Sequence, residues 1–296
     1  MQRAFGDRAA SCTTAGRRAV NEDAVLLAQF APGTELIAVA DGMGGHAAGD
    51  VASNRALQVL HSAIASGDDL PTAVRLANAA VHDEALTRPE CRGMGTTLVA
   101  ALQQDGRYTV ANVGDSRAYR VDDMGIRQLT EDNSFIAEAV RSGKLTAEEA
   151  EQSLWRNAVT RCLGAEPELE VDTYGPFEAV DPHTLLLCTD GVYRAISPEA
   201  MRRYVIEASD AASAVHAITQ AAFEAGSEDN ISVALISFEA APRPVDLKRS
   251  PPAMVLPPAR VRRKHRKLPD GWTLVRGAVI LVGTLLTIVY IARTLS

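Results

Sequence analysis

The acidic residues that could do chemistry in this chain share one setting, the junction between an apolar run and a polar loop. Such runs are typical of buried strands. The junction residues are Asp41 after ELIAVA, Asp190 after TLLLCT, Asp115 after YTVANVG, Asp229 before NISVALISF, and Glu22 and Asp23 before AVLLAQF. Converging strand ends would bring these carboxylates together, and like charges about 4 Å apart repel by several kcal/mol. Mg2+ or Mn2+ would relieve the repulsion, because both ions prefer oxygen ligands.

Each acidic residue also has a simpler interpretation as part of a turn. An Asp–Gly pair after a strand most often forms a turn, and turns are favoured for Asp115, Asp190 and Asp229 when each is considered singly. These residues occur, however, together with the segments NED, DGMGG and CTDG. A shared metal site explains the whole set better than a series of unrelated turns.

The charge of the chain is unevenly distributed. The net charge is −7, yet residues 241–296 contain 11 Lys and Arg against 2 Asp and Glu, whereas residues 1–240 contain 19 against 35. A globular part with this excess of acid does not fit a nucleic-acid-binding protein. Composition alone favours surface solvation as the role of the acidic residues, and bound cations are the competing explanation.

The C-terminal residues predict a membrane anchor. Residues 277–292 are uncharged and mostly apolar, and the aromatic residues Trp272 and Tyr290 stand near the two ends. Because about 20 apolar residues cross a bilayer, we expect a single transmembrane helix over 272–293 rather than a buried core helix. The basic cluster RVRRKHRK precedes it, which places the globular part in the cytoplasm. Residues 240–271 contain 7 of the 14 prolines and predict an extended linker.

The remaining composition gives two expectations. The four cysteines are dispersed and form no CxxC pair, which argues against a zinc site or a disulfide framework. The N-terminus has no apolar h-region, so no secretory signal peptide is expected.

The order of strand and helix patterns predicts the fold class. Strand-like runs are ELIAVA, TTLVAAL, RYTVANV, SRAYRV, TLLLCT and ISVALISF, and helical patterns cover GDVASNRALQVLHSAIAS, LPTAVRLANAAVHDEAL, SPEAMRRYVIEAS and AASAVHAITQAAFEA. Only GD separates RYTVANV from SRAYRV, which predicts an antiparallel hairpin. Helices that follow the first strands and precede the last one indicate an α+β protein, with helices covering a largely antiparallel sheet assembly.

Several ordered motifs show a resemblance to a known family. They are GRRAVNEDAVLL, VADGMGGHAAGDVAS, GMGTTLVAAL, ANVGDSRAYR, LTEDNSF, NAVTRCLG, LLLCTDGVYRAIS and EDNISVAL. Residues 4–239 resemble the bacterial form of the type 2C, metal-dependent Ser/Thr protein phosphatases. The resemblance implies two antiparallel β-sheets sandwiched between pairs of helices, a four-layer α-β-β-α arrangement.

The resemblance also implies a role for each candidate site residue. Asp41 would bridge two Mn2+ or Mg2+ ions, with the Gly42 carbonyl and Glu22 on one ion and Asp190 and Asp229 on the other; Asp23 would orient water, and Asp115 would hold a third, weaker ion. Arg18 would bind the substrate phosphate, although the neighbouring Arg17 is an alternative. His46, in the glycine-rich loop after Asp41, would be the general acid. Two ions 3.5–4 Å apart activate a bridging water for in-line attack, so no phosphoenzyme intermediate is expected.

Two segments vary or extend the family pattern. Asn133 stands where bacterial relatives usually carry histidine, which affects local hydrogen bonding but removes no metal ligand. Residues 134–157 match a flap that contacts protein substrates, and without the resemblance they would equally be a surface helix pair. Thr146 and Glu149, three residues later, predict a capping box at a helix start.

The main hypothesis is therefore a membrane-tethered phosphatase that faces the cytoplasm. Its substrates would be phosphorylated proteins, and the family implies a Ser/Thr kinase or its targets as partner. A catalytically silent phosphoprotein-binding module is the alternative, but it should have lost a metal carboxylate, and Asp41, Asp190 and Asp229 are all present. A two-metal nuclease or nucleotidase is disfavoured because the globular part is acidic.

Overall fold

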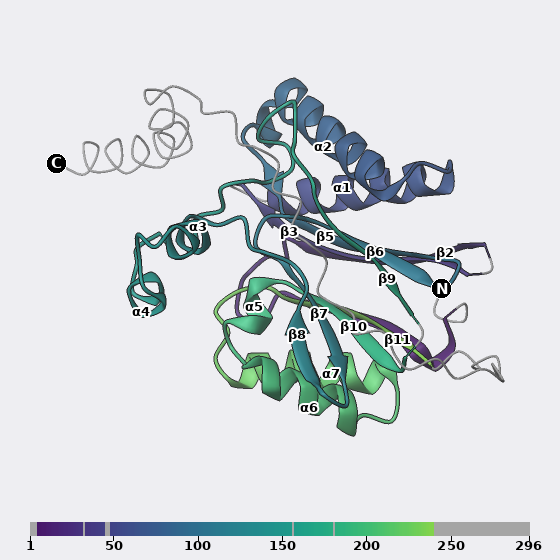
Figure 1. Cartoon of the computed structure of the whole chain (residues 1–296). Helices are drawn as coiled ribbons and strands as arrows, with labels where there is room; N and C mark the ends of the chain where they lie inside the picture. The colour runs from purple at the N-terminus through teal and green to yellow at the C-terminus, as the bar shows by residue number, and fades with distance from the viewer. Residues whose placement is uncertain (1–4, 32, 45–47, 156, 180, 240–296) are drawn as a thin grey trace. The chain divides into compact units, whose positions relative to one another are not determined.

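The computed structural model describes residues 5–31, 33–44, 48–155, 157–179 and 181–239. Two antiparallel β-sheets lie face to face, and a pair of helices covers the outer face of each sheet (Figure 1). This arrangement confirms the predicted α+β fold with four layers. The expected linker and transmembrane helix, residues 240–271 and 272–293, lie outside the described residues. No helix within the described ranges is long and apolar enough to cross a membrane.

The first sheet has the strand order β2-β3-β5-β6-β9, and the short strand β4 pairs with β3. Its strands are β2 (Asp23–Ala31), β3 (Thr34–Met43), β4 (Gly95–Thr96), β5 (Leu98–Gln104), β6 (Arg107–Val113) and β9 (Asp172–Glu178). The β5–β6 hairpin turns at Asp105 and Gly106, which both have positive φ angles, of 50° and 76°. Such left-handed pairs match the twist of the flanking strands.

The second sheet has the order β1-β11-β10-β7-β8. Its strands are β1 (Ala9–Thr14), β7 (Arg117–Asp122), β8 (Gly125–Gln128), β10 (His183–Cys188) and β11 (Ile231–Phe238). β10 is buried along its whole length and lies between β11 and β7. A continuous apolar run such as HTLLLC is expected of a strand that is covered on both faces.

Several of the helices begin at a residue whose side chain caps the helix. Their bounds are α1 (Ala48–Ala65), α2 (Leu70–Thr87), α3 (Phe135–Arg141), α4 (Ala147–Glu151), α5 (Asp190–Tyr193), α6 (Pro198–Glu207) and α7 (Ala211–Glu224), with 3-10 turns η1 (Gly6–Arg8) and η2 (Pro89–Cys91). Asp69 accepts a hydrogen bond from the Thr72 amide at 2.8 Å and Asp210 accepts one from the Ser213 amide at 2.7 Å. These bonds satisfy amides that have no partner inside the helix.

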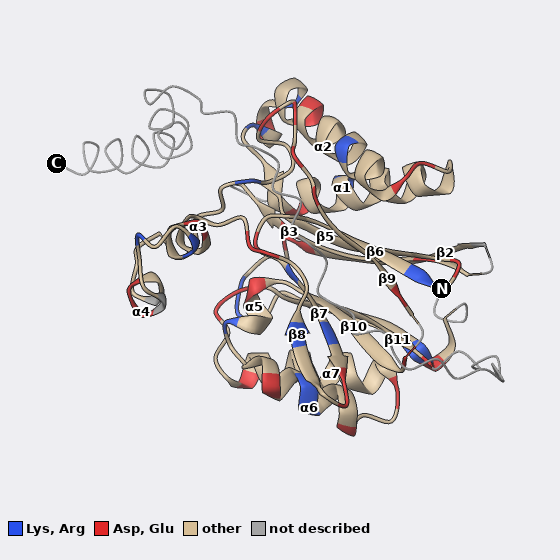
Figure 2. Cartoon of the chain, in the orientation of Figure 1, with Lys and Arg blue, Asp and Glu red and all other residues tan. Residues whose placement is uncertain are grey.

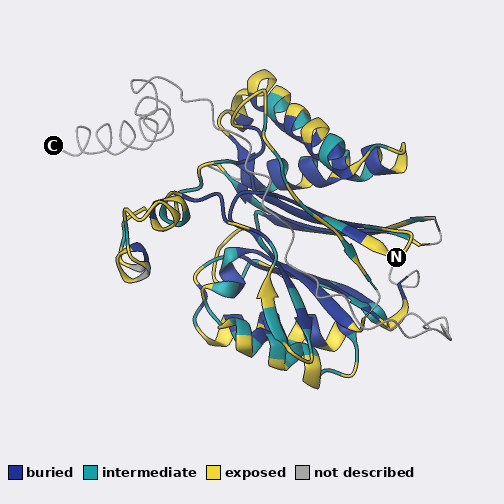
Figure 3. Cartoon of the chain, in the orientation of Figure 1, coloured by how far each residue is buried: buried dark blue, intermediate teal, exposed yellow. Residues whose placement is uncertain are grey.

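Three hydrophobic cores hold the layers together, and Figure 3 shows the buried strands between them. The first joins α1 and α2 to the first sheet, with Leu60 and Val74 packed near Leu36. The second joins α6 and α7 to the second sheet. The third lies between the two sheets and includes Val39 and Leu187. The sheets are therefore fixed face to face, and the loops at their ends are positioned by a rigid frame.

The predicted hairpin between β6 and β7 is wrong. β6 belongs to the first sheet and β7 to the second, so the chain crosses from one sheet to the other at Gly114 and Asp115. Gly114 has a φ of +103°, and a Cβ at this position would collide with Thr97. The GD pair is thus a crossover rather than a hairpin turn, and it places Asp115 between the sheets.

Two further details differ from the expectation. Asp41 does not follow the end of its strand, because β3 continues to Met43 and pairs with β4. Strands β1, β8 and β9 have no counterpart among the predicted runs. β9, with the sequence DTYGPFE, lies at the edge of its sheet, where a proline is tolerated because the outer side of the strand needs no ladder hydrogen bonds.

Candidate functional site

The first pair of acidic residues stands side by side on the hairpin of β2 and β3. Asp23 lies directly opposite Asp41 in the antiparallel register. Like charges opposite each other normally destabilise a sheet. Asp23 is only 6% exposed, and its Oδ1 atom has no hydrogen-bond partner among the described residues. The fold therefore keeps a pair of facing carboxylates, of which Asp23 is buried and Asp41 is half-buried.

The second sheet contributes two more acidic residues. Asp190 begins α5 directly after β10, and Asp229 lies two residues before β11. The Thr189 hydroxyl donates a hydrogen bond of 3.0 Å to Asp23, which connects the second sheet to the first at this point. In Figure 2, acidic positions colour the end of β3 and the start of α5. The Thr189–Asp23 hydrogen bond brings the end of β10 next to the start of β2.

Burial and mutual repulsion change the ionisation of this cluster. Burial, with the neighbouring carboxylates adding to it, raises the pKa of Asp41 well above its usual value. Burial also raises the pKa of Asp23 to about 7 and that of Asp190 to about 6, again with repulsion from other aspartates. Asp41 and Asp190 keep partial solvent access, since the Asp190 side chain is 14% exposed. These residues form an acidic cluster that is largely buried but partly accessible to solvent.

A tight backbone arrangement surrounds Glu22 and Gly42. The Gly42 amide donates to the Glu22 carbonyl at 3.1 Å. A Cβ on Gly42 would collide with the carbonyl oxygens of Gly49 and Glu22, so only glycine fits here. Burial raises the pKa of Glu22, although a hydrogen bond from the Gly49 amide opposes the shift. The glycine therefore lets the start of α1 approach the β2–β3 hairpin closely.

Asn230 is a positioning residue that the sequence patterns did not reveal. Its side-chain oxygen accepts from the Glu22 amide at 2.8 Å, and its amide group donates to the carbonyls of Ala15 and Val20. It thereby fixes the loop before β2 against the start of β11. In the segment EDN, the sequence prediction uses only the aspartate. A buried asparagine beside an acidic residue must also satisfy its own hydrogen bonds, and this indicates a positioning role.

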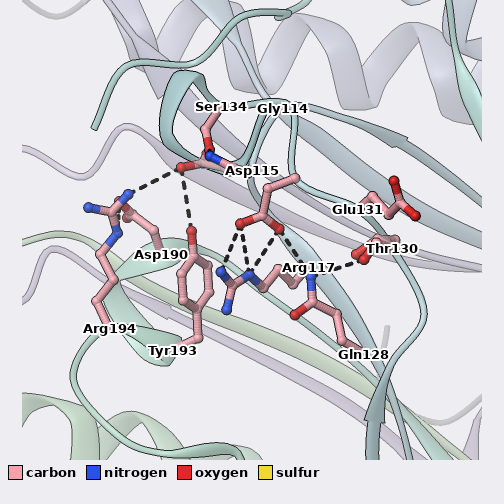
Figure 4. A network of polar contacts seen from close by, with 12 residues as sticks. Gly114, Asp115, Arg117, Gln128, Thr130, Glu131, Ser134, Asp190, Tyr193 and Arg194 are labelled. Carbon is pink, nitrogen blue, oxygen red and sulfur yellow. Dashed lines mark hydrogen bonds and ion pairs between the residues drawn. The ribbon is translucent and has the colours of Figure 1, made fainter. Parts of the chain in front are cut away.

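Asp115 stands apart from the other acidic residues in its contacts. It is 5% exposed, and burial raises its pKa. Its Oδ2 atom accepts hydrogen bonds from the Tyr193 hydroxyl at 3.4 Å and from Arg194 Nη2 at 3.3 Å (Figure 4). The Arg194 Nε atom also forms an ion pair with Asp190 Oδ2 at 3.0 Å. Asp115 is therefore linked to Asp190 through an arginine.

Further polar contacts support the Tyr193 ring. The Arg117 guanidinium lies 3.6 Å from the centre of this ring and forms a bidentate pair with Asp132, with bonds of 3.0 Å and 2.7 Å. Such planar pairs hold both partners in a fixed orientation. Figure 4 shows that this network continues through Gln128 and Thr130. Tyr193 is consequently held below Asp115 by stacking as well as by its own hydrogen bond.

The structure separates the two candidate arginines at the N-terminal side of the site. Arg18 donates to the Glu228 carbonyl and to Asp229 Oδ2, both at 2.9 Å, and its side chain is 53% exposed. Arg17 instead lies over the Phe223 ring, 5.6 Å from its centre. Of the two residues, Arg18 is the one beside the acidic cluster. Arg18 therefore places a solvent-accessible positive charge next to Asp229.

The residues present fit divalent ions. As the side chains stand, no group of three or more His, Cys, Asp or Glu among the described residues is arranged to hold a metal ion. Two of the buried oxygens that have no hydrogen-bond partner among the described residues are Asp23 Oδ1, at the start of a strand of the first sheet, and Asp190 Oδ1, just after a strand of the second sheet. Buried carboxylates of this kind are stable when a cation neutralises them. The donor set consists of hard oxygens, as Mg2+ and Mn2+ require.

Two predicted features flank the acidic cluster. His46 falls in residues 45–47, outside the described residues. Within residues 134–157, the capping box at α4 is confirmed, because the Glu149 amide donates to Thr146 Oγ1 and the Thr146 amide donates to Glu149. Asn133 accepts from the Gly114 amide at 3.0 Å and donates to Asp172 at 2.9 Å, so it braces the crossover that carries Asp115.

The fold agrees with the comparisons with known proteins. A family model described as Protein phosphatase 2C matches residues 13–224, and the chain belongs to that family. The serine/threonine phosphatase Stp of Listeria monocytogenes is 37% identical over 212 residues, which cover 68% of this chain and 83% of that protein.

Solved structures show the same similarity. The serine/threonine phosphatase Stp1 of Staphylococcus aureus has a TM-score of 0.71 at 31% identity, covering 78% of this chain and 95% of that one. The catalytic domain of the phosphatase PstP, solved in complex with two manganese ions, has a TM-score of 0.68 at 32% identity, covering 78% of this chain and 98% of that one.

Proposed function

We propose that the acidic cluster binds two divalent ions and that the protein hydrolyses phosphoserine and phosphothreonine in proteins. The chain is a metal-dependent protein serine/threonine phosphatase by family. The observation that carries the proposal is the convergence of Asp23 and Asp41 from one sheet with Asp190 from the other, at raised pKa values. Mn2+ or Mg2+ is the proposed cofactor, supported by the oxygen donor set and by the two manganese ions in the PstP structure.

The proposed ligand roles are those that the family resemblance implies. Asp41, the carboxylate repelled by most of its neighbours, is the proposed bridge between the two ions. The Gly42 carbonyl and Glu22 would complete one ion site, and Asp190 with Asp229 the other. Asp23 accepts the Thr189 hydroxyl bond through Oδ2 and keeps Oδ1 for a water molecule. When bound, the ions would neutralise the cluster, polarise the phosphoryl group and lower the pKa of a water.

The chain's own cations and acids would handle the substrate. Arg18, beside Asp229, would bind the phosphate through its planar guanidinium and stabilise the charge that develops on the phosphoryl oxygens. His46 would donate a proton to the departing serine or threonine alkoxide. Cys188 does not suit a nucleophile role, because it is fully buried and burial raises its pKa to about 12. Direct hydrolysis without a phosphoenzyme is the proposed course.

The proposal extends to the rest of the chain. Residues 4–239 would form the phosphatase domain and residues 240–271 a linker. Residues 272–293 would anchor the protein to a membrane, with the domain in the cytoplasm, supported by the apolar run and the basic cluster before it. Phosphorylated proteins are the substrates, and a Ser/Thr kinase or its targets is the proposed partner.

Phosphate release from a phosphothreonine peptide tests the reaction. The full-length chain in detergent should release phosphate with Mn2+, lose the activity in EDTA, and recover it when Mn2+ is restored. Activity that persists after complete chelation would falsify the two-ion proposal. A peptide with phosphotyrosine is the matched control, since the proposed substrates are aliphatic phosphate esters.

A pair of neighbouring arginines tests phosphate binding. Arg18→Ala should raise the KM for the phosphopeptide by roughly 10–100-fold, as expected for a lost charge-assisted hydrogen bond. Arg17→Ala removes the same charge one residue away, and its side chain contacts Phe223, so its KM should stay near that of the parent. Equal effects of the two substitutions would mean that only overall charge matters.

Membrane fractionation tests the anchor. The full-length chain should sediment with membranes, whereas a chain that lacks residues 272–296 should remain in the supernatant. The two forms should hydrolyse a soluble phosphopeptide at similar rates, because the anchor would act on location alone. Identical fractionation of the two forms would refute the anchor without affecting the enzyme assignment.

A further inference from the structure

Arg194 occupies the position between Asp115 and Asp190. Its Nε atom lies 3.0 Å from Asp190 Oδ2, and its Nη2 atom lies 3.3 Å from Asp115 Oδ2 (Figure 4). The third nitrogen of the guanidinium, Nη1, donates to the side-chain oxygen of Asn157, which follows the α4 segment. A single planar cation therefore contacts two acidic residues of the site and one residue beside it.

The fold holds Arg194 in this position from several directions. Its amide donates to the Asp190 carbonyl at 3.1 Å, so the arginine lies one helical turn after the aspartate that it pairs with. Tyr193, the preceding residue, donates to Asp115 and is stacked on Arg117. The Arg194 side chain is 31% exposed, compared with 53% for Arg18. Arg194 is thus less exposed than Arg18 and is held between two of the acidic residues.

This geometry does not fit a third divalent ion at Asp115. An ion shared by the Oδ2 atoms of Asp115 and Asp190 would have to lie where the Arg194 guanidinium lies. An arginine stays charged at every accessible pH, so it would repel the ion rather than yield a ligand. Asp190 Oδ1 has no hydrogen-bond partner among the described residues. Asp190 can therefore bind a divalent ion through Oδ1 while its Oδ2 atom pairs with Arg194.

We propose that Arg194 is a built-in cation that takes the place of a third divalent ion and ties Asn157 to the active site. The inference rests on the proposed two-ion site. The Arg194 guanidinium supplies a positive charge beside Asp115 that is permanent and does not depend on the metal concentration. The same side chain couples residues 134–157 to the acidic cluster, since Asn157 ends that segment.

Binding stoichiometry tests the first part. Mn2+ binding to the full-length chain in detergent is measured by titration calorimetry and by the loss of the free Mn2+ electron paramagnetic resonance signal. The parent should bind two ions, and Asp115→Asn should still bind two. Arg194→Ala should bind a third, weaker ion, and the double variant Arg194→Ala with Asp115→Asn should return to two. Arg203→Ala, an exposed arginine on α6, is the matched charge control.

Two outcomes would overturn the proposal. One is a parent that binds three ions and loses one in Asp115→Asn; the other is an Arg194→Ala variant that gains no ion. Failure of the two-ion site itself would look different, because Asp41→Asn would then bind as many ions as the parent. The numbers of ions bound by the Asp115 and Arg194 variants can therefore be interpreted whether or not the two-ion site exists.

Amide hydrogen exchange tests the second part. Exchange in residues 134–157 should become several-fold faster in Arg194→Ala and remain unchanged in Arg203→Ala. Unchanged exchange in the Arg194 variant would show that Asn157 is held by other contacts. The measurement needs neither substrate nor turnover, so a loss of activity does not affect it.

Discussion

The two ends of the β-sandwich are built from the same strands but have opposite chemistry. At one end, aromatic rings from both sheets pack between the sheets. The ring centre of Tyr108 of β6 lies 5.3 Å from that of Phe238 of β11, and the Phe238 ring centre lies 4.8 Å from that of His183 of β10. At the other end, acidic residues follow β10, precede β11, and start β2. We call these the aromatic end and the acidic end.

The comparison shows where the sandwich gains stability and where it loses it. Aromatic contacts of this kind contribute about 0.5–1.5 kcal/mol each beyond their buried area. The aromatic end also buries one carboxylate, Glu35, which forms an ion pair with Arg8. At the acidic end the buried carboxylates lie close to one another, and their pKa values rise. The stable frame therefore tolerates repulsion at the end where ions and substrate would bind.

The largest expected effect is at Asp41. Asp41→Asn should lower phosphatase activity more than about 100-fold, because even indirect partners of a metal contribute 10–100-fold. The same variant should unfold at higher denaturant concentration than the parent in EDTA at pH 8, since it removes one charge from a cluster of like charges. Activity assays and urea unfolding measure the two effects. A variant that loses both activity and stability would contradict the distinction between the two ends.

The pH dependence of stability gives the next effect. The pKa of Asp23 is about 7 in the folded protein, against an ordinary value of 3.8. The folded state thus binds this proton more tightly than the unfolded chain, so its contribution is fully present below about pH 4 and is lost as the pH rises to about 7. In EDTA, Tm should fall by several degrees between about pH 5.5 and pH 8.

Added Mn2+ supplies the control for this experiment. At pH 8 it should restore most of the lost Tm, because the ions neutralise the carboxylates that repel one another. At pH 5.5 it should have a smaller effect, since protons compete for the same oxygens. A rise in Tm with Mn2+ that is equal at both pH values would show that the raised pKa values do not govern the stability of the acidic end.

A substitution at the aromatic end should give the reverse pattern. Phe238→Leu removes a ring that packs on Tyr108 and His183. The free energy of unfolding should decrease by about 1–2 kcal/mol, while kcat for a phosphopeptide should change less than twofold. Urea unfolding and steady-state kinetics provide the test. A large fall in kcat would mean that the aromatic end positions the site as well as stabilising the sheets.

The four layers could be predicted because long periodic segments carry their signal locally. The helices α1, α2, α6 and α7 and the central strands are all evident from apolar periodicity. β9 could not be predicted, since its sequence DTYGPFE lacks a regular pattern and the strand forms by pairing with β6. The hairpin prediction for the β6–β7 junction is wrong for a related reason. The pair GD fits either a hairpin or a crossover, and only the packing of the two sheets decides between them.

The candidate site shows the same limit in more detail. Acidic residues beside glycine at strand ends are visible in the sequence, and the structure brings Asp23, Asp41, Asp115 and Asp190 close enough to perturb one another. The residues that hold them are not visible. Thr189, Asn230 and Arg194 act through side-chain contacts with segments that are far away in the sequence. A contact of this kind has no periodic signature.

The smallest effect is expected at α4, the least stabilised helix at the acidic end. α4 spans only five residues, Ala147–Glu151, and depends on its capping box. Thr146→Ala should lower the local stability of this helix by about 0.5–1 kcal/mol, seen as two- to fivefold faster amide exchange in residues 147–151. Global unfolding should not change, because α4 lies outside the three hydrophobic cores of the sheets. Thr87→Ala near the end of α2 is a suitable control, since its hydroxyl bonds only to its own helix. If Thr146→Ala lowered global stability instead, α4 would belong to the rigid frame, and low local stability would not distinguish the acidic end from the aromatic end.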